Sequence, residues 1–295
     1  MDGEWASGCT LRLLMKTPLF RLVAVAELDS SLGACQSNTS AFETTATSGS
    51  AAAPVLTPGP WRGVLTVQGQ EIPFLFEVKT EAGKPVVYLI NKGLNGEKRL
   101  RCNEISVAGD SATIRLHPFD AALVVRASGK NKLKGTWVKS DTKGSYRVPL
   151  TATAGKQPLF LLGNIKAPYS DYKVKGKWTN AFKEQGGSIY QAIGVFQQNK
   201  ETVTGTFLTS TGDYLYLEGG VNDDILRLST FNGNHAFLFV GKLISSAEFL
   251  PPGNPYGFEP AGIFGDFYSN KFGHETWNAV LDPDAKLPEV RKTAR

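Results

Sequence analysis

The chain has 295 residues, of which 41% are hydrophobic and 20% are charged, and it contains 31 glycines and 17 phenylalanines. This composition is ordinary for a globular protein, and its glycine and aromatic content is typical of turn-rich β proteins. The length allows one large domain or two smaller ones. Because no run of about 18 apolar residues occurs, we expect no transmembrane helix.

The first 35 residues resemble a leader rather than a folded segment. A basic start at Met15, an apolar run at Leu22–Ala26 and a small-residue site at Leu32-Gly-Ala-Cys35 follow one another as in a secretory signal. The last four residues resemble the lipobox of bacterial lipoproteins, in which the cysteine carries the lipid. We therefore expect Cys35 to be lipidated and the membrane to be reached only through this anchor.

Two acidic residues, Glu27 and Asp29, depart from the apolar core that such a leader needs. The alternative is an unremarkable N-terminus without a signal. If the leader works, the protein is extracytoplasmic and tethered to the membrane, in the periplasm or at the outer membrane; otherwise it is cytoplasmic. Residues 36–60 are poor in large apolar residues and are expected to form a flexible tether.

From Trp61 onward the sequence predicts an all-β protein. Short alternating runs such as Arg62–Val67, Ile72–Lys79 and Tyr214–Gly219 are separated by turn residues, and no stretch of useful length has a helical period. We divide this part into a first β region (61–155), a linker (156–171), a second β region (172–281) and a C-terminal linker (282–295). Antiparallel meanders are expected to form two units, each a sandwich or a lipocalin-like half-open barrel.

One pattern recurs through both β regions: an aliphatic residue, then Gly, then Trp or Phe, at alternate positions. It occurs at Leu133–Trp137, Val174–Trp178, Val203–Phe207 and Ile263–Phe267. In a strand these three residues share one face, because successive side chains alternate between faces. A glycine on the buried face lets the strand bend, and a neighbouring aromatic ring can cover the gap. The pattern therefore predicts curved sheets.

Charge is distributed unevenly along the chain. Residues 84–183 hold nineteen Lys or Arg and six Asp or Glu, whereas residues 184–289 hold five and thirteen. Lysines alternate with other residues at Lys130, Lys132 and Lys134, as on the outward face of a strand. We expect solvated faces rather than a nucleic-acid site, and no nucleic-acid partner.

Several stretches resemble the N-terminal region of TlpA-type disulfide reductases, which are thioredoxin-related envelope lipoproteins of Bacteroidota-like bacteria. The resemblance covers most of residues 61–290 and rests on five stretches: Ile114–Asp120, Leu133–Val138, Thr204–Tyr214, Leu228–Phe239 and His274–Trp277. It implies an all-β region in the cell envelope that accompanies a thiol-disulfide oxidoreductase.

The resemblance stops short of the catalytic part of that family. Such proteins continue into a thioredoxin domain with Trp-Cys-x-x-Cys, whose first cysteine attacks disulfides as a thiolate. This chain ends at Arg295, and none of Cys9, Cys35 and Cys102 belongs to such a motif. We therefore expect a truncated form without enzymatic activity or cofactor, and a reductase only in a full-length form.

Other catalytic or metal signatures are weak. The three histidines, His117, His235 and His274, together with four carboxylates could form a metal or catalytic site only if the fold gathered them. The carboxylates considered are Asp120, Asp213, Glu218 and Glu275. None of these residues has ligand spacing, and we expect the histidines to make local hydrogen bonds and no metal to bind.

Aromatic residues supply the remaining candidates for contact with a ligand or partner. Tyr169, Tyr172 and Tyr256 fall in predicted loops, and Trp178 and Trp277 fall in strands, where core packing competes with a binding role. Three hypotheses stay open. The chain is a non-catalytic accessory module that meets a protein partner in the envelope, a barrel that binds a small apolar ligand or glycan, or an enzyme assembled from distant residues.

Overall fold

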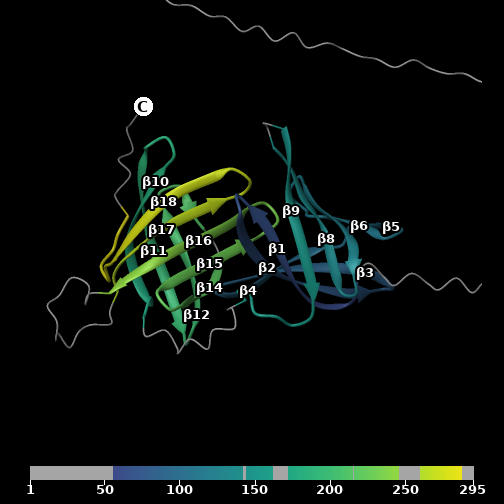
Figure 1. Cartoon of the computed structure of the whole chain (residues 1–295), viewed down its shortest axis with the longest axis horizontal. Helices are drawn as coiled ribbons and strands as arrows, with labels where there is room; N and C mark the ends of the chain where they lie inside the picture. The colour runs from purple at the N-terminus through teal and green to yellow at the C-terminus, as the bar shows by residue number, and fades with distance from the viewer. Residues whose placement is uncertain (1–55, 142–143, 162–171, 215, 246–259, 288–295) are drawn as a thin grey trace, which may run out of the picture. The chain divides into compact units, whose positions relative to one another are not determined.

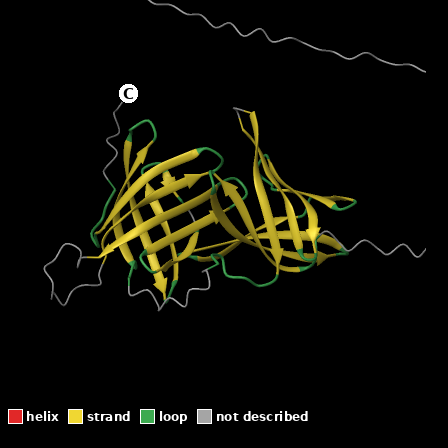
Figure 2. Ribbon diagram, viewed as in Figure 1, coloured by secondary structure: helices red, strands yellow, loops and turns green. Residues whose placement is uncertain are grey.

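The computed structural model describes residues 56–141, 144–161, 172–214, 216–245 and 260–287. All regular elements in these residues are strands joined by loops (Figure 2). The expected all-β class is confirmed: the strands form one curled half-barrel sheet and one closed barrel, and all pairings are antiparallel. The described residues belong to one compact domain, and its two units are the half-barrel and the barrel.

The half-barrel is an open sheet with strand order β4-β3-β2-β1-β9-β8-β7-β6-β5. Its strands are β1 (Gly59–Val67), β2 (Gln70–Glu81), β3 (Lys84–Gly93), β4 (Gly96–Cys102), β5 (Ile105–Ala108), β6 (Ser111–Arg115), β7 (Ala121–Gly129), β8 (Lys132–Asp141) and β9 (Gly144–Ala154). The two edge strands, β4 and β5, are separated in sequence only by Asn103 and Glu104. The sheet must therefore curl until its edges approach each other at this connection.

The barrel consists of β10 (Gly176–Glu184), β11 (Ile189–Asn199), β12 (Thr202–Thr209), β14 (Leu217–Asn222), β15 (Ile225–Phe231), β16 (Ala236–Ser245), β17 (Pro260–Ser269) and β18 (Gly273–Leu281), with the short β13 (Gly212–Asp213) beside β12. Strands follow the order β11-β10-β18-β17-β16-β15-β14-β12 (Figure 1). A further pairing of β11 with β12 closes the ring. Closure leaves no free edge among these eight strands.

Glycines within the strands allow the curvature, and two of them, Gly135 and Gly205, belong to the predicted pattern. Gly205 lies opposite Phe196 of β11, and the Phe196 ring occupies the space that a Cβ atom at Gly205 would need. Gly63 has the same relation to Phe74 of β2. At Gly135 a Cβ atom would meet the backbone of β7 at Val124. The sheets therefore bend where a side chain is missing, and an aromatic ring covers two of these gaps.

The barrel interior is filled by aromatic rings from facing strands. The centroid of Phe239 lies 4.3 Å from that of Phe267 and 4.6 Å from that of Phe207. Trp178 and Phe182 are fully buried in the same cluster. The described members of this core all belong to residues 172–281.

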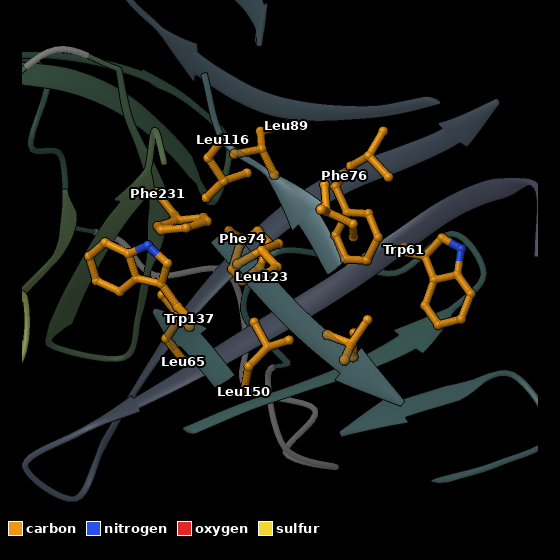
Figure 3. Packing of buried hydrophobic residues seen from close by; sticks show 14 of the residues in the cluster. Trp61, Leu65, Phe74, Phe76, Leu89, Leu116, Leu123, Trp137, Leu150 and Phe231 are labelled. Atoms are coloured by element: carbon orange, nitrogen blue, oxygen red, sulfur yellow. The ribbon is translucent and has the colours of Figure 1, made fainter. Parts of the chain in front are cut away.

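The half-barrel core is completed by the outer face of the barrel. Phe231 of β15 is fully buried and packs against Phe74, with ring centroids 4.7 Å apart, and against Trp137, at 5.2 Å (Figure 3). Ala236 and Leu238 of β16 belong to the same cluster. The β15–β16 hairpin therefore fills part of the concave side of the half-barrel.

Candidate functional site

Hydrogen bonds join the barrel to strands β2 and β3 of the half-barrel. The Ser229 hydroxyl donates to the Pro73 carbonyl at 2.9 Å, and the Thr230 hydroxyl donates to Asn91 Oδ1 at 3.0 Å. Both hydroxyl groups are buried, so these bonds satisfy polar groups that would otherwise be costly to bury. Two buried hydrogen bonds therefore contribute to the contact between the half-barrel and the barrel.

A cleft of about 430 Å³ lies beside these bonds, between the β1–β2 hairpin and the outer face of β14–β16. Its lining residues are Arg62, Gly69, Gln70, Glu71, Pro73, Phe160, Leu161, Gly220, Asn222, Arg227, Leu238 and Val240. The volume falls in the range of small-molecule sites, which combine apolar walls with a few polar groups and often lie between structural units. This cleft is the candidate functional site.

Arg62 is the least exposed charged side chain of the cleft, with 7% of its surface accessible. It lies on the face of β1 opposite to Trp61, and its Nε donates to the Leu159 carbonyl at 2.7 Å. Burial lowers the pKa of Arg62, and the charge of nearby Glu71 acts in the opposite direction. An arginine pKa starts so high that the group stays charged at neutral pH. The fold therefore holds a cation at the wall of this cavity.

Arg227 contributes the second positive charge. It is half-buried on the outward face of β15, opposite Gly220 of β14, where no side chain competes for space. Within the described residues, neither Arg62 nor Arg227 forms an ion pair. Glu71 is exposed and is the only carboxylate among the lining residues. The lining thus carries a net charge of one positive unit at neutral pH.

The barrel also contains a polar cluster among its aromatic rings. The Tyr190 hydroxyl donates to Glu275 Oε2 at 2.7 Å and lies 3.0 Å from the Tyr214 hydroxyl. Burial raises the pKa of Glu275, the Tyr190 hydrogen bond lowers it, and Glu184 raises it further. Burial also raises the pKa of Tyr190. This cluster has the features of a satisfied core network, and none of its three side chains lines the cleft.

The three histidines are held apart by their positions on different strands and loops. His117 pairs with Glu104 at 2.7 Å, and His274 pairs with Asp266 at 2.8 Å. His235 stacks on Phe237 and lies 2.9 Å from Asn234 Nδ2. Glu275 points into the barrel, where it accepts the Tyr190 hydrogen bond, and His274 points to the opposite face of β18. In the part of the chain that the structure describes, no three His, Cys, Asp or Glu residues form a group that could hold a metal.

The aromatic residues predicted to contact a ligand or partner differ in their burial. Trp178 and Trp277 are buried in the barrel core, where their Nε1 groups donate to the carbonyls of Val174 and Asp266. Neither indole is available to a partner at the surface, because the alternation of the strand turns it inward. Tyr172 packs partly against the same core. Tyr169, Tyr256 and the lipidation candidate Cys35 lie outside the described residues.

An outer groove of about 440 Å³ runs over β10, β17 and β18. Ile189 and Phe264 line it, with 67% and 54% of their surfaces exposed. Large apolar side chains exposed together are a feature of surfaces that meet a partner.

None of the described residues forms a helix with the length and hydropathy to span a bilayer.

Sequence reasoning did not identify the arginines of the cleft. Arg62 follows Trp61 in an alternating strand, so it has the sequence pattern of a solvent-facing residue, and Arg227 lies between Leu226 and Leu228 in the same way. Burial of Arg62 results from the segment around Leu159, which is almost a hundred residues away in sequence. No local signal predicts such a contact.

Comparison with known proteins adds little to these observations. No model of a known protein family matches the chain, and no curated protein matches it. One solved structure with similarity is the crystal structure of a protein of unknown function from the DUF3598 family of Nostoc punctiforme. It is 11% identical, the alignment covers 76% of this chain and 94% of that one, and the TM-score is 0.23. This likeness is too weak to support an argument, and the resemblance to TlpA-type reductases stays a prediction.

Proposed function

We propose that this chain is a non-catalytic binding module that holds a small ligand in the cleft between the half-barrel and the barrel. The observation that carries the proposal is a cavity of about 430 Å³ that combines apolar walls with the buried guanidinium of Arg62. The interior of the barrel is packed with aromatic rings, so we place the ligand outside the barrel rather than within it.

A neutral apolar dye tests this proposal without assuming the charge of the ligand. N-phenyl-1-naphthylamine fluoresces when it enters an apolar site, and we expect saturable binding of one dye per chain. Val240→Trp should fill the cleft and abolish the signal, whereas Val280→Trp, at a position that is 58% exposed on the barrel, should leave it unchanged. Equal dye binding in the wild type and in a folded Val240→Trp variant would contradict the proposal.

Recognition of a protein partner is the second candidate function. The outer groove with its exposed Ile189 and Phe264 supports it. A photo-crosslinking amino acid at position 264 should capture one protein in intact cells, and the same amino acid at exposed position 130 on the half-barrel should not. Equal capture at both positions would count against this groove as a specific surface.

The location of the module is also a proposal. We propose that it acts in the bacterial envelope as an accessory of a thiol-disulfide reductase of the TlpA type, tethered by a lipid on Cys35. Support comes from the leader pattern and the resemblance of the sequence stretches. Cys35→Ser should release the protein from membranes, and unchanged membrane association would exclude the lipid anchor.

A further inference from the structure

We propose that the ligand of the cleft is a small carboxylic acid with an apolar tail, bound as a monoanion. The inference rests on the proposed function and adds the chemistry of the ligand. Its basis is the combination of two arginines, one glutamate and several apolar side chains around one cavity.

The charges of the lining select for a single negative charge. Arg62 and Arg227 together with Glu71 leave one positive unit at the cavity. Charges interact more strongly beside apolar, poorly solvated walls than in water. A monoanion neutralises this positive charge. A dianion would carry more negative charge than the lining can neutralise and would be repelled by Glu71.

Arg62 is positioned in advance for an anion. Its Nε is held by the Leu159 carbonyl, which fixes the plane of the guanidinium while using one of its five N–H donors. A guanidinium held in this way presents a rigid fork that matches the two oxygens of a carboxylate. Arg227 reaches the same cavity from β15, so the anion meets donors from both units.

The rest of the cavity suits a hydrocarbon chain. Pro73 comes from β2, Phe160 from the segment after β9, and Leu238 and Val240 from the outward face of β16. Leu238 is buried, and Phe160 and Val240 are partly buried. Apolar surface that is already gathered around a cavity favours an apolar tail, because burying the tail removes both surfaces from water.

Competition between decanoate and decanol tests the inference directly. Both are titrated against the protein with bound N-phenyl-1-naphthylamine, and they differ only in the terminal group. We expect decanoate to bind about tenfold or more tightly, because charge-assisted hydrogen bonds add to the same apolar contacts. Equal affinities would overturn the inference and leave the proposed function intact, whereas the absence of dye binding would overturn the proposed function itself.

Arginine variants assign the effect to the cleft. Arg227→Gln should weaken decanoate about tenfold while changing decanol by less than about twofold. Arg126→Gln, which removes an exposed arginine of β7, is the matched control and should change neither. A parallel loss of both ligands in Arg227→Gln would show a structural role and overturn the inference. If Arg227→Gln does not fold, Arg227→Lys is used instead, because it keeps the positive charge. An unchanged affinity for decanoate, with the thermal midpoint of the variant intact, would support charge recognition. An equal loss of affinity for decanoate and decanol would oppose it.

Glu71→Gln tests the selection for one charge. In the wild type, the dianion decyl phosphate should compete less well than decanoate at pH 8. Removal of the carboxylate should raise the affinity of decyl phosphate more than that of decanoate. If Glu71→Gln leaves the ratio of the two affinities unchanged, Glu71 does not select for a monoanion and the inference fails in that respect.

Discussion

The half-barrel and the barrel are built from the same sequence pattern but differ in how their sheets end. The barrel closes because β11 pairs with both β10 and β12, and its described core draws only on its own strands. The half-barrel keeps two edges, and its core includes Phe231, Ala236 and Leu238 from the barrel. An open sheet needs another surface to complete its core, and here the outer face of its neighbour provides that surface.

This difference also places the candidate site. A closed barrel whose interior is filled offers no room for a ligand, whereas the contact between two curved surfaces leaves space where they diverge. The cleft lies at the edge of that contact, beside the Ser229–Pro73 hydrogen bond. The same contact therefore contributes both to stability and to the cleft.

The largest effect is expected when the two units are separated. A fragment of residues 172–295 should fold alone and unfold cooperatively, because its aromatic core is self-contained. A fragment of residues 56–161 should lack a cooperative transition, because it loses Phe231 and its neighbours from the core. Circular dichroism during urea unfolding measures both. Cooperative unfolding of the 56–161 fragment at the midpoint of the full chain would contradict the comparison.

Phe231→Ala tests the same dependence within the intact chain. Removal of a fully buried ring between Phe74 and Trp137 should lower the free energy of unfolding by about 3–5 kcal/mol. Phe264→Ala is the matched control, since its ring is 54% exposed, and it should change that free energy by less than about 0.5 kcal/mol. Equal losses in the two variants would show that Phe231 is not a core residue.

The sequence predicts the strands well but not their closure. Alternation and turn residues are local signals, so β1 and β2 lie close to the predicted runs Arg62–Val67 and Ile72–Lys79. The strand predicted at Tyr214–Gly219 begins instead at Leu217, because Tyr216 adopts a positive φ of 62°. The pairing of β10 with β18 joins residues about a hundred positions apart, and no local pattern encodes it.

The same limit applies to the candidate site. Arg62 and Arg227 have the alternating pattern of solvent-facing side chains, yet Arg62 is buried, with the carbonyl of the distant Leu159 against its guanidinium. The tryptophans were visible as candidates because of their residue type, yet their strand positions turn Trp178 and Trp277 inward. The type of a residue suggests the chemistry it can perform, but the place of that residue in the fold depends on pairings between distant segments.

His235 allows a test of the hairpin that joins the two units. Burial lowers the pKa of His235, and the charge of Lys139 lowers it further, while the hydrogen bond with Asn270 raises it. The unfolded chain therefore binds a proton near pH 6.5 that the folded chain binds only at lower pH. Its contribution to stability is present above pH 6.5 and is lost as the pH falls through the folded pKa.

Urea unfolding at pH 7.5 and pH 5 should reveal this loss. Between these values the wild type should lose more stability than His235→Gln, by up to about 1 kcal/mol. An identical pH dependence of the wild type and His235→Gln would show that His235 does not titrate differently in the folded chain.

The smallest effect is expected inside the barrel, at Glu275. Because burial raises the pKa of Glu275, the folded state holds its proton more tightly than the unfolded state. The stability that this group contributes is present below about pH 4.3 and is lost as the pH rises through the folded pKa. Glu275→Gln carries no charge and can still accept the Tyr190 hydrogen bond, so it should gain on the order of 0.5 kcal/mol over the wild type at pH 7 and nothing near pH 4.

Asp213→Asn, which removes an exposed carboxylate, is the control for Glu275→Gln and should show no such gain. A loss of stability in Glu275→Gln at pH 7 would mean that the ionised carboxylate stabilises the barrel. The ionised Glu275 carboxylate would then be stabilised by its partners in the folded barrel rather than destabilised by its burial. The contrast with the half-barrel would also change, because each unit would depend on a charged group held near its core: Arg62 beside the cleft and Glu275 among the aromatic rings.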